Sequence, residues 1–146
     1  MADKANAGFT MKVTPASEGG GGDSFELGTK VVKSVTYKTD TPDDSNARTQ
    51  DVGCILVVKG EFIQSAEEDT KKMAQWSLQQ DTPYKNVVVK NLASSGTTIR
   101  EYTLTCAFVV DYTEDFESDT GHGSFTLVMK QRKDLNHEVK IEGGYK

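Results

Sequence analysis

A long run of alternating residues constrains the fold of this chain more than any other feature. In residues 99–112 (IREYTLTCAFVVDY), polar Thr103 and Thr105 are interleaved with apolar or aromatic side chains. Such a period of two marks a β-strand with one face against a core. As one unbroken strand, the run would be about 45 Å long, whereas a typical strand is about 17–20 Å long. A strand of this length indicates a large sheet, a barrel or an assembly. The expected core-facing set is Tyr102, Leu104, Cys106, Phe108 and Val110.

Shorter β patterns lie on both sides of this run and predict a mainly β fold. They cover residues 9–14, 25–37, 53–63, 86–92 and 124–131. A single helix is expected over residues 66–80, because Ser65 and Glu68 have the spacing of a capping box. Met73 and Trp76 share one face of this helix and are expected to dock it on the sheet.

Two connections lack apolar residues large enough to anchor them. Residues 15–23 contain four consecutive glycines and are expected to form a flexible loop. Residues 39–51 (TDTPDDSNARTQD) form an extended polar arm, and loops of this length tend to be functional or disordered. A cation site on the arm is disfavoured because its aspartates do not follow the calcium-loop pattern.

Length and charge narrow the class of protein. A chain of 146 residues fits a single domain, 1–146, and is long enough to bury a hydrophobic core without added disulfides or structural metals. The net charge of −5 argues against a nucleic-acid binder. Neither a signal peptide nor an apolar stretch of membrane-spanning length is visible, so we expect folding in the cytosol without membrane insertion. Cys54 and Cys106 lie in apolar runs, which favours buried free thiols over a disulfide.

The sequence shows no catalytic or metal-binding constellation, and no cofactor is expected. His122 and His137 have no partners at the spacing of a triad or a zinc site. No phosphate-binding motif follows the glycine run. The acidic stretch after residue 112 offers Asp115 and Glu117 as an acid and base, although such clusters are more often solvated charge.

The order of elements resembles the inner-tube proteins of contractile injection systems, namely the haemolysin-coregulated protein (Hcp) of type VI secretion and related phage and extracellular-particle tube proteins. The resemblance rests on DTKKMAQW (residues 69–76), YKNVVVKNL (84–92), and the pairing of EYTLTCAFVVDYTEDFES with GSFTLVMKQRK. It covers roughly residues 25–133 and contains no invariant catalytic signature. The glycine run at 19–22 departs from the familiar Hcp start.

The resemblance implies a small β-barrel of two packed antiparallel sheets with one flanking helix. It also implies hexameric rings that stack into a tube, assembled in the cytoplasm and then secreted or carried on an extracellular particle. Sheath, baseplate or spike proteins and effector cargo would be the partners. Thr103 and Thr105 would be lumen-facing candidates. Inter-subunit or inter-ring contacts would come from the arm, through Asp40, Asp43, Asp44, Ser45, Asn46, Arg48 and Gln50.

Two other hypotheses remain open at the level of sequence. The first is a monomeric β-barrel that binds a small apolar ligand among Trp76, Tyr102 and Phe108. The second is a hydrolase that uses the acidic residues Asp115 and Glu117. The tube hypothesis predicts rings, the ligand hypothesis predicts an internal cavity and a monomer, and the hydrolase hypothesis predicts activity that depends on those two carboxylates.

Overall fold

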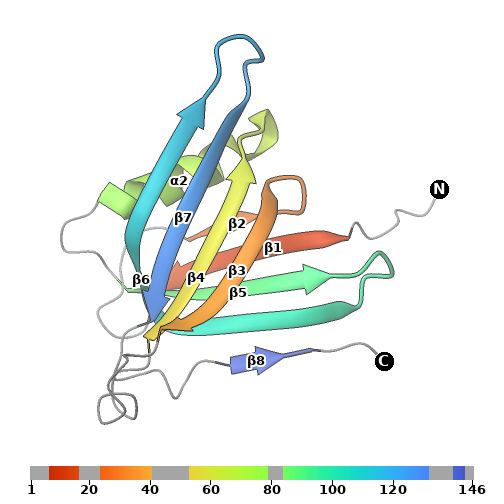
Figure 1. The fold of residues 1–146 in the computed structure, drawn as a ribbon. Coiled ribbons are helices and arrows are strands. Elements are labelled where there is room, and N and C mark those ends of the chain that lie inside the picture. Colours follow the sequence, from red (N-terminus) through yellow and green to blue (C-terminus); the bar gives the residue numbers. More distant parts are fainter. Residues whose placement is uncertain (1–6, 17–23, 41–52, 79–83, 132–139, 144–146) are drawn as a thin grey trace.

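A computed structural model describes residues 7–16, 24–40, 53–78, 84–131 and 140–143. These residues form strands, a 3₁₀ turn and a helix (Figure 1). The strands are β1 Gly8–Pro15, β2 Phe25–Leu27, β3 Val32–Asp40, β4 Gly53–Glu61, β5 Lys85–Leu92, β6 Thr98–Phe116, β7 Gly123–Gln131 and β8 Lys140–Glu142. The 3₁₀ turn η1 covers Gln64–Ala66, and the helix α2 covers Glu67–Leu78.

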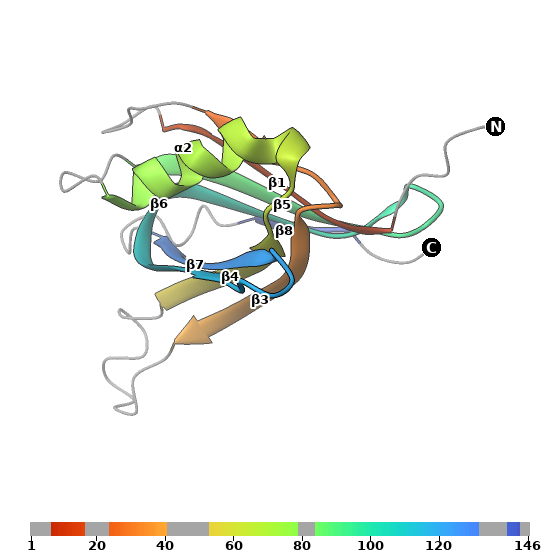
Figure 2. The ribbon, with the colours of Figure 1, turned by 90° about the horizontal axis from the view of Figure 1, so that it is seen from above.

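All described strand pairs are antiparallel and follow the order β2-β1-β5-β6-β7-β4-β3, with β8 added beside β6. Strand β6 belongs to two layers. Its first half pairs with β5, where Thr103 is opposite Val88, and its second half pairs with β7, where Thr113 is opposite Thr126. Because β6 bends between these halves, the sheet turns back on itself, and Figure 2 shows the two layers one above the other.

The bend in β6 coincides with Cys106, which has a φ of 63° and is the single described non-glycine residue with positive φ. The register shifts at this point, so that one extra residue of β6 is inserted between Leu104 and Ala107. An inserted residue is a β-bulge, which bends a strand and increases its twist. The backbone N–H of Cys106 donates a hydrogen bond of 3.3 Å to Asn86 Oδ1, which holds the bulge against β5.

The bulge changes which side chains of β6 face the core. Leu104 is buried before it, and Ala107 is buried after it, so the inward positions move from even to odd numbers. A second register shift, between Val109 and Asp111, restores even numbering, and Tyr112 packs against the core. The expected core positions of Phe108 and Val110 are therefore wrong, and Val110 is 45% exposed.

The core fills the space between the two layers. Its members come from both layers and from α2, and many have no exposed surface. They include Met11, Val13, Leu27, Leu56, Val58, Met73, Leu104, Leu127 and Met129. Apolar burial of this kind stabilises the fold by about 25 cal/mol per Å².

The prediction of a mainly β fold with one flanking helix is confirmed. A closed barrel is not formed by the described strands, because β2 and β3 remain at opposite ends of the strand order. The layers instead meet through side chains, including a stack of Tyr37 on Tyr102 with ring centroids 4.8 Å apart. This contact links β3 to β6 without backbone pairing.

Helix α2 packs on one side of the layers, where it contacts β2 and β6. Met73 and Trp76 are buried, and the Trp76 ring lies 6.2 Å from that of Phe25. On the same side of the helix, Asp69 Oδ1 accepts a hydrogen bond of 3.1 Å from the N–H of Glu26. Among the described residues, no helix is long and apolar enough to cross a membrane.

The predicted start of the helix is wrong in detail. Ser65 lies inside η1, whose N-cap is Ile63 and has no side-chain capping hydrogen bond. The 3₁₀ turn leads directly into α2, and Thr70 Oγ1 donates a hydrogen bond of 2.9 Å to the Ala66 carbonyl at this junction. The predicted end near residue 80 lies outside the described residues, and α2 is described up to Leu78.

The predicted loop and arm fall mainly outside the described residues. Pro15 is the last residue of β1, and the N–H of Ala16 donates to the Tyr84 carbonyl, so the loop begins later than expected. Thr39 and Asp40 belong to β3, which shortens the predicted arm at its start. The remainder, residues 17–23 and 41–52, stays a prediction.

The bulge makes a direct prediction about stability. We expect Cys106→Val to lower the free energy of unfolding by about 1–3 kcal/mol, because a β-branched side chain is strained at positive φ. Cys106→Gly should cost less than Cys106→Val, because glycine adopts positive φ without a Cβ penalty. Urea unfolding of both variants measures the difference; equal losses would show that the bulge does not constrain this position.

Candidate assembly surface

The residues expected to make contacts lie in three places. Asp40 ends β3, while Asp43, Asp44, Ser45, Asn46, Arg48 and Gln50 lie outside the described residues. Thr103 and Thr105 are half-buried and point away from the core in the first half of β6, and the Thr105 carbonyl accepts a hydrogen bond from Gln131 Nε2. Met73 and Trp76 are buried inside the subunit, where they attach α2.

Strand β3 is a long edge. Among the described strands it pairs with β4 alone, over Val32–Asp40, and its Thr36 and Lys38 are exposed. An edge strand presents unpaired backbone N–H and C=O groups and is a template for pairing with another chain. The opposite end of the strand order, β2, is a three-residue edge. Strand β8, which also has three residues, is paired with β6 alone among the described strands. The described strands thus offer dissimilar edges for lateral contact.

A hairpin made by β6 and β7 projects beyond the rest of the second layer (Figure 1). Pairing continues to Phe116 opposite Gly123. Two backbone hydrogen bonds of 2.9 Å close the turn, from the N–H of Glu117 to the His122 carbonyl and from the N–H of Gly121 to the Glu117 carbonyl. These two bonds define the backbone of the turn that carries Glu117 and His122.

Aromatic stacking supports the projecting hairpin from one side. The ring of Phe116 stacks on that of Phe62 with centroids 5.3 Å apart, and Phe62 in turn contacts Phe125. Phe116 nevertheless remains 67% exposed. Gly123 leaves room for this stack, since an added Cβ would lie 2.4 Å from the Phe116 ring and 3.0 Å from that of Phe62.

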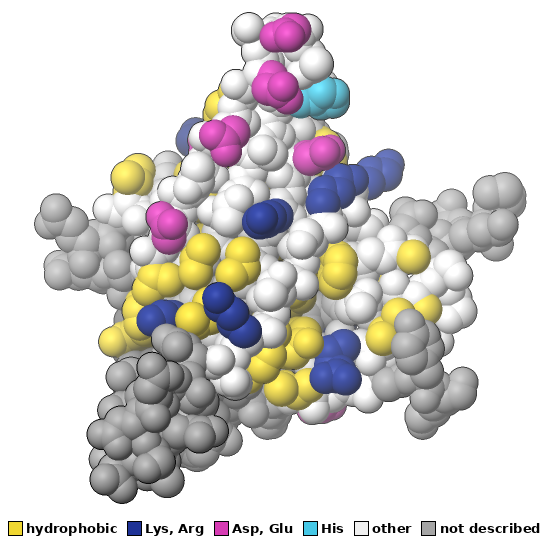
Figure 3. Space-filling model, in the orientation of Figure 1, with side chains coloured by type: hydrophobic (Ala, Val, Ile, Leu, Met, Phe, Trp, Pro, Cys, Tyr) yellow, Lys and Arg dark blue, Asp and Glu magenta, His cyan; other side chains and the backbone are white. Residues whose placement is uncertain are grey.

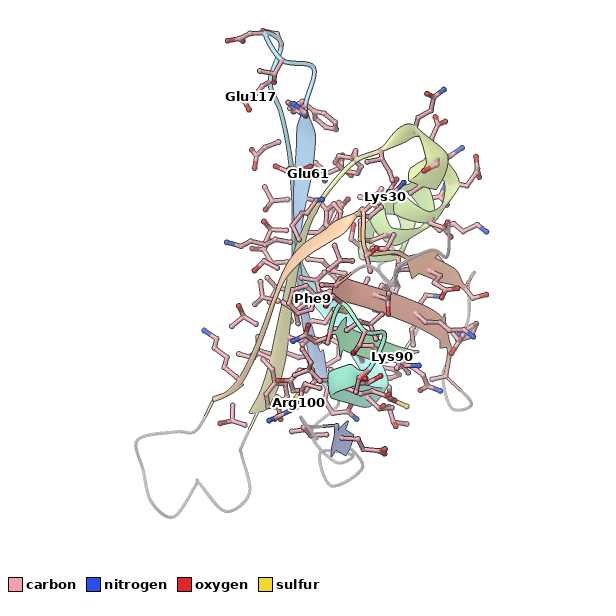
Figure 4. All side chains as sticks on the ribbon, turned by 90° about the vertical axis from the view of Figure 1, so that its right-hand side faces the viewer. Phe9, Lys30, Glu61, Lys90, Arg100 and Glu117 are labelled. Carbon is pink, nitrogen blue, oxygen red and sulfur yellow. The ribbon has the colours of Figure 1, made fainter. Side chains whose placement is uncertain are left out.

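The end of the hairpin is acidic. Asp115, Glu117 and His122 line an open depression of about 360 Å³ together with Glu61 of β4. Figure 4 shows Glu117 at the projecting end and Glu61 nearer the body of the molecule. Within the described ranges, no group of histidine, cysteine and carboxylate side chains is arranged to hold a metal ion.

This depression gives little support to the hydrolase hypothesis. Asp115 and Glu117 are exposed, so the low-dielectric surroundings that tune a catalytic acid are missing. The described contacts of His122 in the turn are made by its backbone, whose N–H donates to Thr120 Oγ1 at 3.2 Å. Its ring is not held in place by any hydrogen bond described for this part of the chain.

The seam between β3 and β6 contains perturbed titratable groups. Burial raises the pKa of the Tyr37 phenol to about 12, and a hydrogen bond with the Cys54 side chain acts in the same direction. Burial also raises the pKa of the Cys54 thiol. Both cysteines are buried free thiols, as expected from the sequence. The Tyr37 phenol and the Cys54 thiol are therefore neutral at physiological pH, so the seam between β3 and β6 buries no charge from either group.

Neither a protein-family model nor a curated protein matches the sequence. Solved structures do match. A chain of the anti-feeding prophage baseplate has a TM-score of 0.57 and 14% identity, with coverage of 100% of this chain and 99% of that one. Hcp1 from Flavobacterium johnsoniae has a TM-score of 0.53 and 21% identity, covering 92% and 95%. A further Hcp protein has a TM-score of 0.55 and 11% identity, covering 95% and 99%.

The chain has the fold of the Hcp-like tube proteins. The predicted resemblance is thereby confirmed at the level of fold. The Hcp-like fold here carries features that sequence reasoning missed. The stack of Phe62 on Phe116 joins residues far apart in the chain, and the one local signal for it was Gly123, which leaves room for the ring.

The stack predicts a specific effect of a small substitution. We expect Gly123→Ala to destabilise the protein by about 1–3 kcal/mol, because the new methyl group must displace the Phe116 ring. The double variant Gly123→Ala/Phe116→Ala should lose less than the sum of its single variants, since the second change removes the clash. Gly28→Ala is the control, as nothing lies within 4 Å of its added Cβ. Thermal unfolding measures all four; additive losses would exclude the proposed clash.

The seam predicts a loss of stability at alkaline pH. The pKa of Tyr37 is raised from 10.0 to about 12 by folding, so the neutral phenol is favoured in the native state. Its stabilising contribution is complete below pH 10 and is lost as pH rises towards 12. We expect Tyr37→Phe to flatten the fall in melting temperature over this interval. An unchanged slope would show that Tyr37 does not titrate as described; tyrosinate absorbance provides the independent check.

Proposed function

We propose that this protein is a structural subunit of the inner tube of a contractile injection system. The observation that carries the proposal is the match of fold over whole chains, covering 100% of this chain and 99% of the baseplate chain. Hexameric rings, their stacking and the delivery of effectors are part of the proposal.

The two edges of the sheet support ring formation. Strands β3 and β2 lie at opposite ends of the strand order and are not alike. Contact between unlike surfaces is heterologous and closes into a ring when the rotation between copies permits. Ring closure through β2 and β3 would cover both of these strands on every copy, which removes the hazard of leaving the long edge of β3 open.

We assign the remaining expected roles within the same proposal. The arm would contact neighbouring subunits or the adjacent ring, with Asp40, Asp43, Asp44, Ser45, Asn46, Arg48 and Gln50 as its candidate residues. Thr103 and Thr105 would face the lumen. Sheath, baseplate or spike proteins and effector cargo would be the partners, with assembly in the cytoplasm before export or incorporation into a particle.

The ligand-binding alternative has weaker support. Its proposed pocket residues do not share one cavity, because Trp76 packs against Phe25 under the helix and Tyr102 stacks on Tyr37 at the opposite seam. The third member, Phe108, lies outside the core cluster and packs edge-on to Tyr84. A structural role that needs no catalytic group accounts better for the filled interior and exposed carboxylates.

Light scattering with negative-stain microscopy tests the proposal. We expect a species of about six times the 16.0 kDa subunit mass and ring-shaped particles with a central opening, with or without stacking. A strictly monomeric protein at all concentrations and salt conditions would overturn the tube proposal. A monomer that gains thermal stability from a small apolar compound would favour the alternative.

A further inference from the structure

The outer face of the second layer changes character along its strands. At the end near the β3–β4 connection, the register places Lys38 beside Ile55 and Ile55 beside Lys130. The next row towards the hairpin contains Val57 and Val128. These side chains alternate with buried neighbours such as Leu56 and Met129, so they point outward. We call Lys38, Ile55, Val57, Val128 and Lys130 the lysine–apolar surface.

The opposite end of the same face carries negative charge. Glu61, Ser124 and Asp115 form its last paired row, and Glu117 and Asp119 follow in the turn. We call Glu61, Asp115, Glu117 and Asp119 the acidic tip. Figure 3 shows acidic side chains gathered at the projecting end, and lysines among hydrophobic side chains lower on this face. The same face also carries Lys59 in the row before Glu61, and Asp111 opposite Val128. The two ends therefore differ in net charge, with four carboxylates at the tip and two lysines beside one carboxylate at the other end.

We propose that the acidic tip of one copy docks on the lysine–apolar surface of the next copy along the tube. The occupant is a second copy because a single chain carries both members of the complementary pair at opposite ends of one face. The exposed ring of Phe116 lies at the same end of the hairpin but on its opposite face, where it stacks on Phe62, so the tip makes this contact through its carboxylates. This inference rests on the proposed tube function and deepens it.

The location of the two surfaces selects stacking over ring closure. Strands β4 and β7 are internal in the sheet, so neighbours that pair with β2 and β3 do not pair with them, and Lys38 alone among these residues lies on an edge strand. Because the two surfaces lie at opposite ends of these strands, their contact displaces one copy from the next along the strand direction. A head-to-tail contact that does not close on itself propagates into an open assembly. Opposite charge across such a contact also fixes its direction.

Charge reversal tests this contact in the full-length protein. Variant one carries Glu117→Lys and Asp119→Lys, and variant two carries Lys130→Glu on the internal strand β7. Lys38 is left unchanged because it lies on β3, the edge proposed to close the ring. We expect both variants to form intact rings that stack poorly, with the protein concentration for half-maximal stacking raised at least about tenfold. Raising salt from about 0.05 to 0.5 M should weaken stacking of the wild type, because charges on a solvated surface are screened.

A mixture of the two variants provides the decisive measurement. Each contact in an alternating stack then joins opposite charges, so the mixture should stack although neither variant does alone. The matched control for variant two is Lys90→Glu, which makes the same charge change on an exposed site of the first layer. Figure 4 shows Lys90 well away from Glu117. Sedimentation velocity and negative-stain microscopy count rings and stacks, and circular dichroism checks folding.

Several outcomes would overturn the inference. Normal stacking by either variant, or failure of the mixture to stack when both rings are intact, would exclude this contact. Loss of the rings themselves would place the charges within the ring. If the chain's own segment 41–52 covers the lysine–apolar surface, variant two would lose thermal stability and mixing would restore nothing. Wild-type rings that never associate would overturn the stacking contact but keep the ring proposal, whereas a wild-type monomer would overturn both.

Discussion

The bend in β6 is the constraint on which the rest of the structure depends. One residue in a left-handed conformation, Cys106, inserts an extra position and turns the strand from the first layer into the second. Positive φ is costly for a residue with a Cβ. The conformation is stabilised by the hydrogen bond to Asn86 and by the core that closes around Ala107. Without the bend, β5 and β7 would continue one flat sheet with no enclosed interior.

The same bend explains why the hairpin projects. Once β6 has left the first layer, its second half has β7 as its partner through Phe116, beyond the last paired residue of β4 at Glu61. An isolated two-stranded hairpin is only marginally stable in water. Here Phe62 supplies a third contact by stacking on Phe116, and Gly123 leaves the space that this ring occupies. The body of the protein thus holds an acidic turn well outside its own core.

Sequence periodicity predicted the parts of the fold that follow a regular repeat. Met73 and Trp76 recur at helical spacing and are buried, and the alternating residues of β7 follow the burial expected from a period of two. Periodicity failed where an inserted residue breaks the repeat, which is why Phe108 and Val110 were assigned to the core. The expectation of a closed barrel was wrong for a related reason, because local patterns do not reveal whether strands that are distant in the chain, such as β2 and β3, pair with each other.

The candidate surfaces illustrate a further limit of local patterns. Lys38 and Lys130 are distant in the chain and become neighbours of Ile55 only through the register of three strands. Taken strand by strand, these two charges indicate only a solvated surface. Taken together across the three strands, they place two lysines at one end of the same face. In the proposed assembly, edges and ends have different consequences: lateral pairing of edges would be satisfied when a ring closes, whereas the ends of the strands would stay available for contact with a ring above or below. A subunit with complementary ends can therefore add further rings in a single direction without using up the contacts that close each one.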